Sequence, residues 1–143
     1  MHQFSLIAVL MIVAAAQGQD SDANKADLKK LQGTWIIESS THDGKALPEK
    51  GGRVTFENDK MSIAPPKGTK GGGEEGTFKI DATKKPKTLT FTPKDAKNAA
   101  NAPRMIYEFA GETLRIVVAP PTKNPTEFSD KGQTLWTLKR ESK

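Results

Sequence analysis

The chain has 143 residues and no cysteine, so disulfide bonds and thiolate metal sites are excluded, and its length fits one domain with one hydrophobic core. Its 22 lysine and arginine residues exceed its 17 aspartate and glutamate residues, which gives a formal net charge of +5. Both signs are spread along the chain. This pattern favours an ordinary charged surface, and we expect no nucleic-acid partner.

The first residues resemble an export signal. Residues 4–16 form an apolar run that is too short to span a bilayer comfortably, and Ala16-Gln17-Gly18 follows as a small-x-small cleavage site. We therefore expect a signal peptide over 1–18, a mature domain over 19–143, and a secreted or periplasmic protein. The membrane is then contacted only through the signal segment before cleavage. An uncleaved membrane anchor is the alternative.

A short polar helix is expected next, over residues 20–31. Ser21 or Asp22 can cap its start and Gly33 can stop it. Leu28 and Leu31 are three residues apart and share one helix face, so they can dock on a larger core. Alone, such a helix would be marginal.

From Thr34 onward the hydrophobic pattern changes to period two, which is typical of β-strands. Turn residues such as Asn58-Asp59 and Gly111-Glu112 separate the alternating segments. No second helical pattern is present, so the chain should be all-β, as an up-and-down barrel or a sandwich. The eight expected strands are 34–39, 53–57, 60–63, 76–81, 87–92, 104–109, 113–118 and 134–140.

The alternation also predicts which side chains face the interior. The expected inward set is Trp35, Ile37, Val54, Phe56, Met61, Ile63, Phe78, Ile80, Leu89, Phe91, Met105, Tyr107, Phe109, Leu114, Ile116, Val118, Trp136 and Leu138. Ile36, Ile106, Val117 and Leu135 break the pattern and could lie under the helix or form a small outer apolar patch.

An eight-stranded barrel is just wide enough to be filled by side chains or to hold one small ligand. Most of the inward residues are large, which favours a mostly filled interior with, at most, a small apolar cavity. We expect Phe56, Met61, Phe91 and Met105 to be its candidate ligand-binding residues, with Tyr107 as one of its few polar groups.

Gly33-Thr34-Trp35 resembles the G-x-W signature that opens the first strand of lipocalins and related calycin barrels. The resemblance implies that Trp35 seals the closed end of the barrel and that a basic residue of the last strand packs over it. Arg140 shares a face with Trp136 and is the expected partner, with Lys139 in its place if the register shifts by one. Gly33, Trp35 and Arg140 would then form a barrel-end plug.

A wider match covers about residues 26–141 and resembles a small lipocalin-like domain family that is abundant in planctomycete bacteria. Family members commonly carry a glycine in the loop where this chain has Thr122-Lys123-Asn124. The resemblance implies an eight-stranded antiparallel up-and-down barrel with a short N-terminal helix, and no activity. The matching segments are Asp27-Leu28-Lys29-Lys30-Leu31-Gln32-Gly33-Thr34-Trp35, Asp43-Gly44-Lys45, Gly76-Thr77-Phe78-Lys79-Ile80-Asp81, Lys84-Lys85-Pro86-Lys87, Pro125-Thr126-Glu127-Phe128 and Leu138-Lys139-Arg140-Glu141.

Residue types for catalysis are sparse. The mature chain has one histidine, His42, which we expect at a turn, and the side chains of the adjacent Glu74 and Glu75 should diverge. We therefore predict that the protein has no catalytic residues, no metal site and no cofactor, and that it is not an enzyme. Pro125-Thr126-Glu127-Phe128 is interpreted as a structural tie, with Phe128 packing under the last loop.

Two functional hypotheses follow. The first is an exported, monomeric lipocalin-like binding module for a small, partly apolar molecule. The second is a structural or protein-interaction domain of the cell envelope, with a filled barrel and a partner protein on an outer apolar patch around Ile36, Ile106 or Val117.

Overall fold

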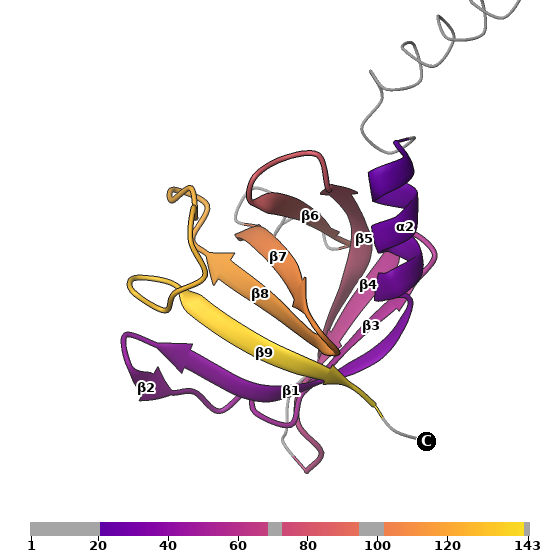
Figure 1. The fold of residues 1–143 in the computed structure, drawn as a ribbon. Coiled ribbons are helices and arrows are strands. Elements are labelled where there is room, and N and C mark those ends of the chain that lie inside the picture. The colour runs from indigo at the N-terminus through magenta and orange to yellow at the C-terminus, as the bar shows by residue number, and fades with distance from the viewer. Residues whose placement is uncertain (1–20, 69–72, 95–101, 142–143) are drawn as a thin grey trace, which may run out of the picture.

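The computed structural model describes residues 21–68, 73–94 and 102–141 and shows one helix beside a closed β-barrel (Figure 1). The predicted signal peptide over 1–18 lies outside the described residues. The elements are α2 (Asp22–Leu31), β1 (Gly33–His42), β2 (Lys45–Ala46), β3 (Arg53–Glu57), β4 (Lys60–Ala64), β5 (Glu74–Asp81), β6 (Lys87–Pro93), β7 (Arg104–Ala110), β8 (Thr113–Ala119) and β9 (Thr134–Arg140).

The strands form an antiparallel up-and-down barrel. Each of β3 to β8 pairs with the next strand, β3 pairs with β1, and β9 pairs back to β1 to close the sheet. Strand β2 pairs only with β1 and extends the sheet at its margin. The eight barrel strands confirm the predicted fold class.

Strand β1 runs three residues further than predicted because it contains a bulge. Its register against β9 shifts between Ile37 and Ser39, so Ser40, instead of Ser39, faces Trp136. Ser40 is consequently buried. Strict alternation would have turned this serine outward.

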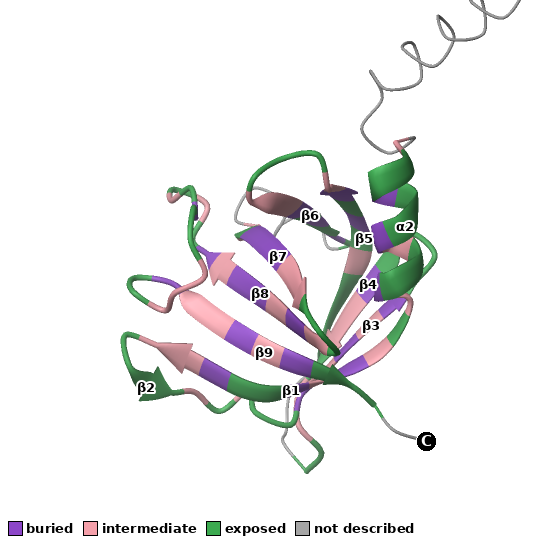
Figure 2. Cartoon of the chain, in the orientation of Figure 1, coloured by how far each residue is buried: buried purple, intermediate pink, exposed green. Residues whose placement is uncertain are grey.

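The predicted inward side chains form the core of the barrel, and Figure 2 shows buried residues recurring along the barrel strands. All of the predicted inward side chains are buried except Ile63, Phe109 and Val118, which are partly buried and pack against the same cluster. Large aromatic and branched side chains from opposite strands therefore fill most of the barrel, as the sequence predicts.

Two of the pattern-breaking residues are covered on the outer face. Ile106 and Val117 are register partners in β7 and β8, and both are buried. The segment between β8 and β9 is held beside them: Arg104 Nε donates to the Pro121 carbonyl at 2.9 Å, and Arg115 Nη2 donates to the Phe128 carbonyl at 3.3 Å. The segment between β8 and β9 therefore lies beside the apolar patch that these two residues would otherwise expose.

Helix α2 is attached to the barrel through a buried asparagine. Asn24 Nδ2 donates to the Ile80 carbonyl at 3.1 Å, and Asn24 Oδ1 accepts from the Ala82 amide at 2.6 Å. Ser21 caps the helix by accepting from the Asn24 amide at 3.0 Å. These bonds place the helix over the barrel end that carries the β5–β6 turn. Within the described ranges, no helix has the length and apolar character to cross a membrane.

Candidate functional site at the open end of the barrel

The helix end of the barrel is sealed by Trp35 and Arg140. The Arg140 guanidinium carbon lies 4.4 Å from the centre of the Trp35 ring system. Trp35 Nε1 donates to the Leu31 carbonyl at 2.9 Å, and Arg140 donates to the carbonyls of Lys30 and Gln32. A cation stacked on the indole thus also satisfies carbonyls at the negative end of the helix dipole.

The backbone at Gly33 makes this arrangement possible. Gly33 has φ +117°, and a Cβ there would lie 3.1 Å from Arg140 Nη1. Lys139, the alternative partner considered for Trp35, points elsewhere: its Nζ lies 3.6 Å from Glu38 Oε2 in an exposed ion pair. The structure therefore brings Gly33, Trp35 and Arg140 together at one end.

Tyr107 belongs to the same end and not to a ligand cavity. Its hydroxyl donates to Asp27 Oδ2 of the helix at 2.8 Å, and the same oxygen accepts from Lys87 Nζ at 3.0 Å. Burial, followed by the hydrogen bond to Asp27, raises the pKa of Tyr107 far above its ordinary value. Phe56 is also a core residue, and its ring lies edge-on to Phe78 with centroids 5.0 Å apart. Sequence alternation places these side chains inward but cannot assign them to an end of the barrel.

The opposite end of the barrel holds a cavity of about 390 Å³, within the size range of small-molecule sites. Phe91 and Met105, both predicted ligand-binding residues, line it, whereas Phe56, Met61 and Tyr107 do not. Its inner wall is apolar, and its rim comes from the loops that follow β2, β4 and β6. The described lining residues are Ile37, Pro48, Glu49, Gly52, Ile63, Ala64, Pro65, Pro66, Gly73, Glu74, Phe91, Pro103, Met105, Val118 and Trp136.

Two lining residues of the cavity carry polar groups whose arrangement does not follow from the sequence pattern. Trp136 Nε1 is the one buried side-chain nitrogen or oxygen without a hydrogen-bond partner in the part of the chain that the structure describes. On the neighbouring strand, buried Ser40 donates to Glu49 Oε1 at 2.6 Å and so fixes this carboxylate at the rim. Trp136 was predicted to point inward, but only three-dimensional contacts show that its N–H is unpaired.

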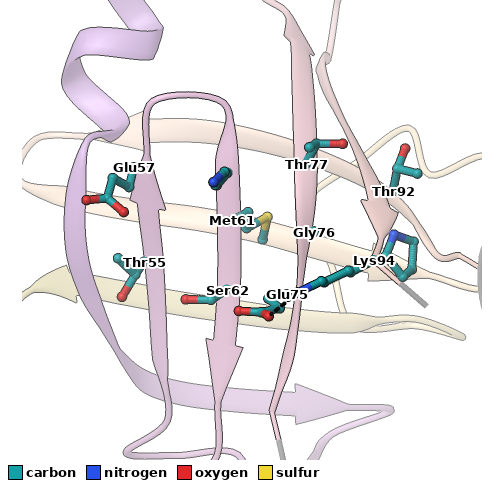
Figure 3. Close-up of a pocket in the computed structure, with 11 residues that line it drawn as sticks. Thr55, Glu57, Met61, Ser62, Glu75, Gly76, Thr77, Thr92 and Lys94 are labelled. Carbon is teal, nitrogen blue, oxygen red and sulfur yellow. Dashed lines mark hydrogen bonds and ion pairs between the residues drawn. The ribbon is translucent and has the colours of Figure 1, made fainter.

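Met61 lies instead beneath a groove of about 430 Å³ on the outer face of β3 to β6 (Figure 3). Met61 faces Gly76 across the β4–β5 pair. A Cβ at Gly76 would lie 2.0 Å from the Thr92 carbonyl oxygen of β6, so the two strands leave no space for a side chain there. The charged lining groups are balanced, with an exposed ion pair of 3.5 Å between Glu75 and Lys94. The described lining of this groove is Thr55, Glu57, Lys60, Met61, Ser62, Glu75, Gly76, Thr77, Thr92, Pro93 and Lys94.

The open-end cavity is the better candidate site because it combines an apolar interior with an unpartnered buried donor. Nothing comparable is found in the lining of the outer groove. Among the described residues, no three histidine, aspartate or glutamate side chains are grouped so that they could hold a metal ion. His42, predicted to lie at a turn, is instead the last residue of β1, where its Nδ1 is 3.2 Å from Thr134 Oγ1 of the paired strand.

Comparison of the chain with models of protein families, with characterised proteins and with solved structures found no significant match. The class of protein is therefore defined by its own architecture. A closed eight-stranded up-and-down barrel, preceded by a short helix and sealed by a tryptophan of the first strand under an arginine of the last, is a lipocalin-like fold of the calycin type.

Proposed function

We propose that this protein is a lipocalin-like binding module that takes one small, partly apolar molecule into the open end of its barrel. The observation that carries the proposal is the 390 Å³ cavity at the end opposite the Trp35–Arg140 plug. One end is sealed by side chains and a helix, so the other end is the natural entrance. The proposed role is binding without catalysis, by a monomer.

The size of the cavity sets the expected affinity. A ligand that buries about 300 Å² of apolar surface gains about 7.5 kcal/mol from its transfer out of water. Lost translational and rotational freedom offsets part of this gain, at about 4 kcal/mol or more. The remaining free energy of about 3.5 kcal/mol corresponds to a dissociation constant in the millimolar range, so tighter binding requires a specific polar contact in addition to the apolar term.

The proposed setting is outside the cytoplasm. The apolar run at 4–16 and the small-x-small site at 16–18 support export as a secreted or periplasmic protein, and the matching segments support membership of the lipocalin-like domain family of planctomycetes. Sequencing the amino terminus of the secreted protein tests the first point. A mature chain that begins at Gln19 agrees with the proposal, and an intact Met1 opposes it.

A structural or protein-interaction role in the cell envelope is the second candidate. Its sequence support was an outer apolar patch, and two members of that patch, Ile106 and Val117, are buried beside the β8–β9 segment. Ile36 and Leu135 remain half-buried. The observations therefore favour the cavity over the outer face.

Native mass spectrometry of the protein purified from its own host tests the proposed function. We expect a small-molecule adduct on the wild type and its loss in Val118→Phe, which fills the cavity with an aromatic ring. Lys79→Phe adds the same ring at an exposed position of β5 and is the matched control. An adduct that survives Val118→Phe, or absence of any adduct together with no uptake of added apolar probes, contradicts the proposal.

A further inference from the structure

The charge of the open-end cavity restricts what it can bind. The only ionisable side chains in its described lining are two acids, Glu49 and Glu74, and no lysine or arginine lines it. A ligand carboxylate would meet like charge without a cation to pair with it, which is unfavourable in a partly desolvated site. The cavity therefore selects against fatty acids and other anionic amphiphiles.

Glu49 is held in a fixed place relative to the cavity. Ser40 Oγ uses its one hydrogen in the 2.6 Å bond to Glu49 Oε1. Glu49 Oε2 has no hydrogen-bond partner among the described residues and remains an acceptor at the rim. A ligand group near it gains by donating a hydrogen bond.

Trp136 supplies the complementary group. It faces Ser40 across the β1–β9 pair, and both Trp136 and Glu49, whose carboxylate Ser40 holds, line the cavity. The unpartnered Nε1–H can only donate. The nitrogen is covered in the unliganded barrel, so an acceptor reaches it when neighbouring lining side chains shift. An acceptor that does so removes the cost of a buried, unpaired donor.

We infer that the ligand carries an uncharged group that both accepts and donates a hydrogen bond, namely an alcohol or an amide on an apolar body. Its oxygen accepts from Trp136 Nε1, and its O–H or N–H donates to Glu49 Oε2. This inference rests on the proposed function, because it names the ligand class of the same site.

A series of three compounds that share an unbranched ten-carbon chain tests the ligand class. We would measure how 1-decanol, decyl methyl ether and decanoate displace the neutral fluorophore N-phenyl-1-naphthylamine at pH 7. We expect decanol to displace the fluorophore with the highest affinity. The ether should bind several-fold more weakly because it cannot donate a hydrogen bond, and decanoate at least about tenfold more weakly than decanol. Equal displacement by decanoate and decanol overturns the inference while leaving the proposed function intact. If neither the fluorophore nor any of the three probes binds, the proposed function itself fails.

Two conservative variants assign the contacts. Trp136→Phe keeps an aromatic ring and removes the donor, so decanol and the ether should each bind about fivefold more weakly, with fluorophore binding retained. Glu49→Gln removes the charge, so decanoate should gain at least about threefold relative to decanol. Glu112→Gln, on the β7–β8 turn at the sealed end, is the matched control and should change neither ratio. Unchanged decanol binding in Trp136→Phe, or an unchanged decanoate-to-decanol ratio in Glu49→Gln, contradicts the inference.

Discussion

Arg140 and Trp35 are register partners at the closure of the barrel, and the arginine's guanidinium carbon lies 4.4 Å from the indole centre. One comes from the last strand and the other from the first, so the same pair completes the sheet and covers its end. The arginine also binds carbonyls of Lys30 and Gln32 at the end of the helix. Barrel closure, helix docking and sealing of this end therefore depend on the same arginine, and the binding function that we propose uses the opposite end.

Removal of the Arg140 side chain should destabilise the fold without affecting the ligand cavity. Arg140→Ala loses the stacking on Trp35 and leaves helix-end carbonyls without their donor, so we expect a loss of about 2–3 kcal/mol in the free energy of unfolding. Urea denaturation measures it. The neighbouring Lys139→Ala removes only an exposed ion pair and should cost less than about 1 kcal/mol. Equal costs for the two variants would show that the plug contributes nothing.

Asn24 should be the main attachment of the helix to the barrel. Asn24→Ala leaves the Ile80 carbonyl and the Ala82 amide without the bonds that this side chain provides, and we expect a loss of about 2–3 kcal/mol. Lys25→Ala, one residue further on the exposed face, should stay within about 0.5 kcal/mol. Hydrogen exchange of the helix amides provides a second measurement, with faster exchange expected in Asn24→Ala alone.

Tyr107 is the only tyrosine of the chain, so its ionisation can be followed by ultraviolet absorbance without interference from other tyrosines. Burial and the bond to Asp27 raise its pKa in the folded protein, whereas the unfolded chain should titrate near pH 10. The associated stability is therefore fully present below about pH 10 and decreases as the pH rises further. Tyr107→Phe should lose this alkaline dependence. A tyrosine that titrates near pH 10 while the barrel stays folded would contradict the contact with Asp27.

Gly76 should tolerate no side chain, because a Cβ there would lie 2.0 Å from the Thr92 carbonyl oxygen of the neighbouring strand. We expect Gly76→Ala to cost more than about 2 kcal/mol, since the backbone of β5 or β6 must shift. Gly111→Ala is the matched control: it has φ +65° but open space around it, and should cost about 1 kcal/mol. Chemical denaturation of both variants gives the comparison, and a smaller loss at Gly76 than at Gly111 would be inconsistent with the strand geometry.

Period-two alternation and turn chemistry predicted the eight barrel strands and most of the core but left a barrel or a sandwich open. The G-x-W resemblance at Gly33-Thr34-Trp35 favoured the barrel. The two-residue strand β2 was missed because it is too short to show alternation. Tyr107 was assigned to the ligand cavity because alternation shows that a side chain points inward but not whether Asp27 of a separate helix takes its hydroxyl. Both outer residues Ile106 and Val117 are buried beside a loop whose path the sequence pattern does not contain.

The ligand cavity was the least predictable feature. Phe91 and Met105 were predicted to face inward and both line the cavity, but its polar groups depend on a bulge in β1 that turns Ser40 inward and lets it hold Glu49. Bulge positions follow from local backbone fit and not from hydrophobic pattern. The unpaired Nε1–H of Trp136 is likewise a property of the assembled barrel.

The location of a bound probe tests most directly whether the open-end cavity is the binding site. We would record intermolecular nuclear Overhauser effects between N-phenyl-1-naphthylamine and the methyl groups of the labelled protein. We expect contacts to Met105, Ile63 and Val118, which line the open-end cavity, and none to Met61. Contacts to Met61 without contacts to Met105 and Val118 would place the probe in the outer groove and contradict the account.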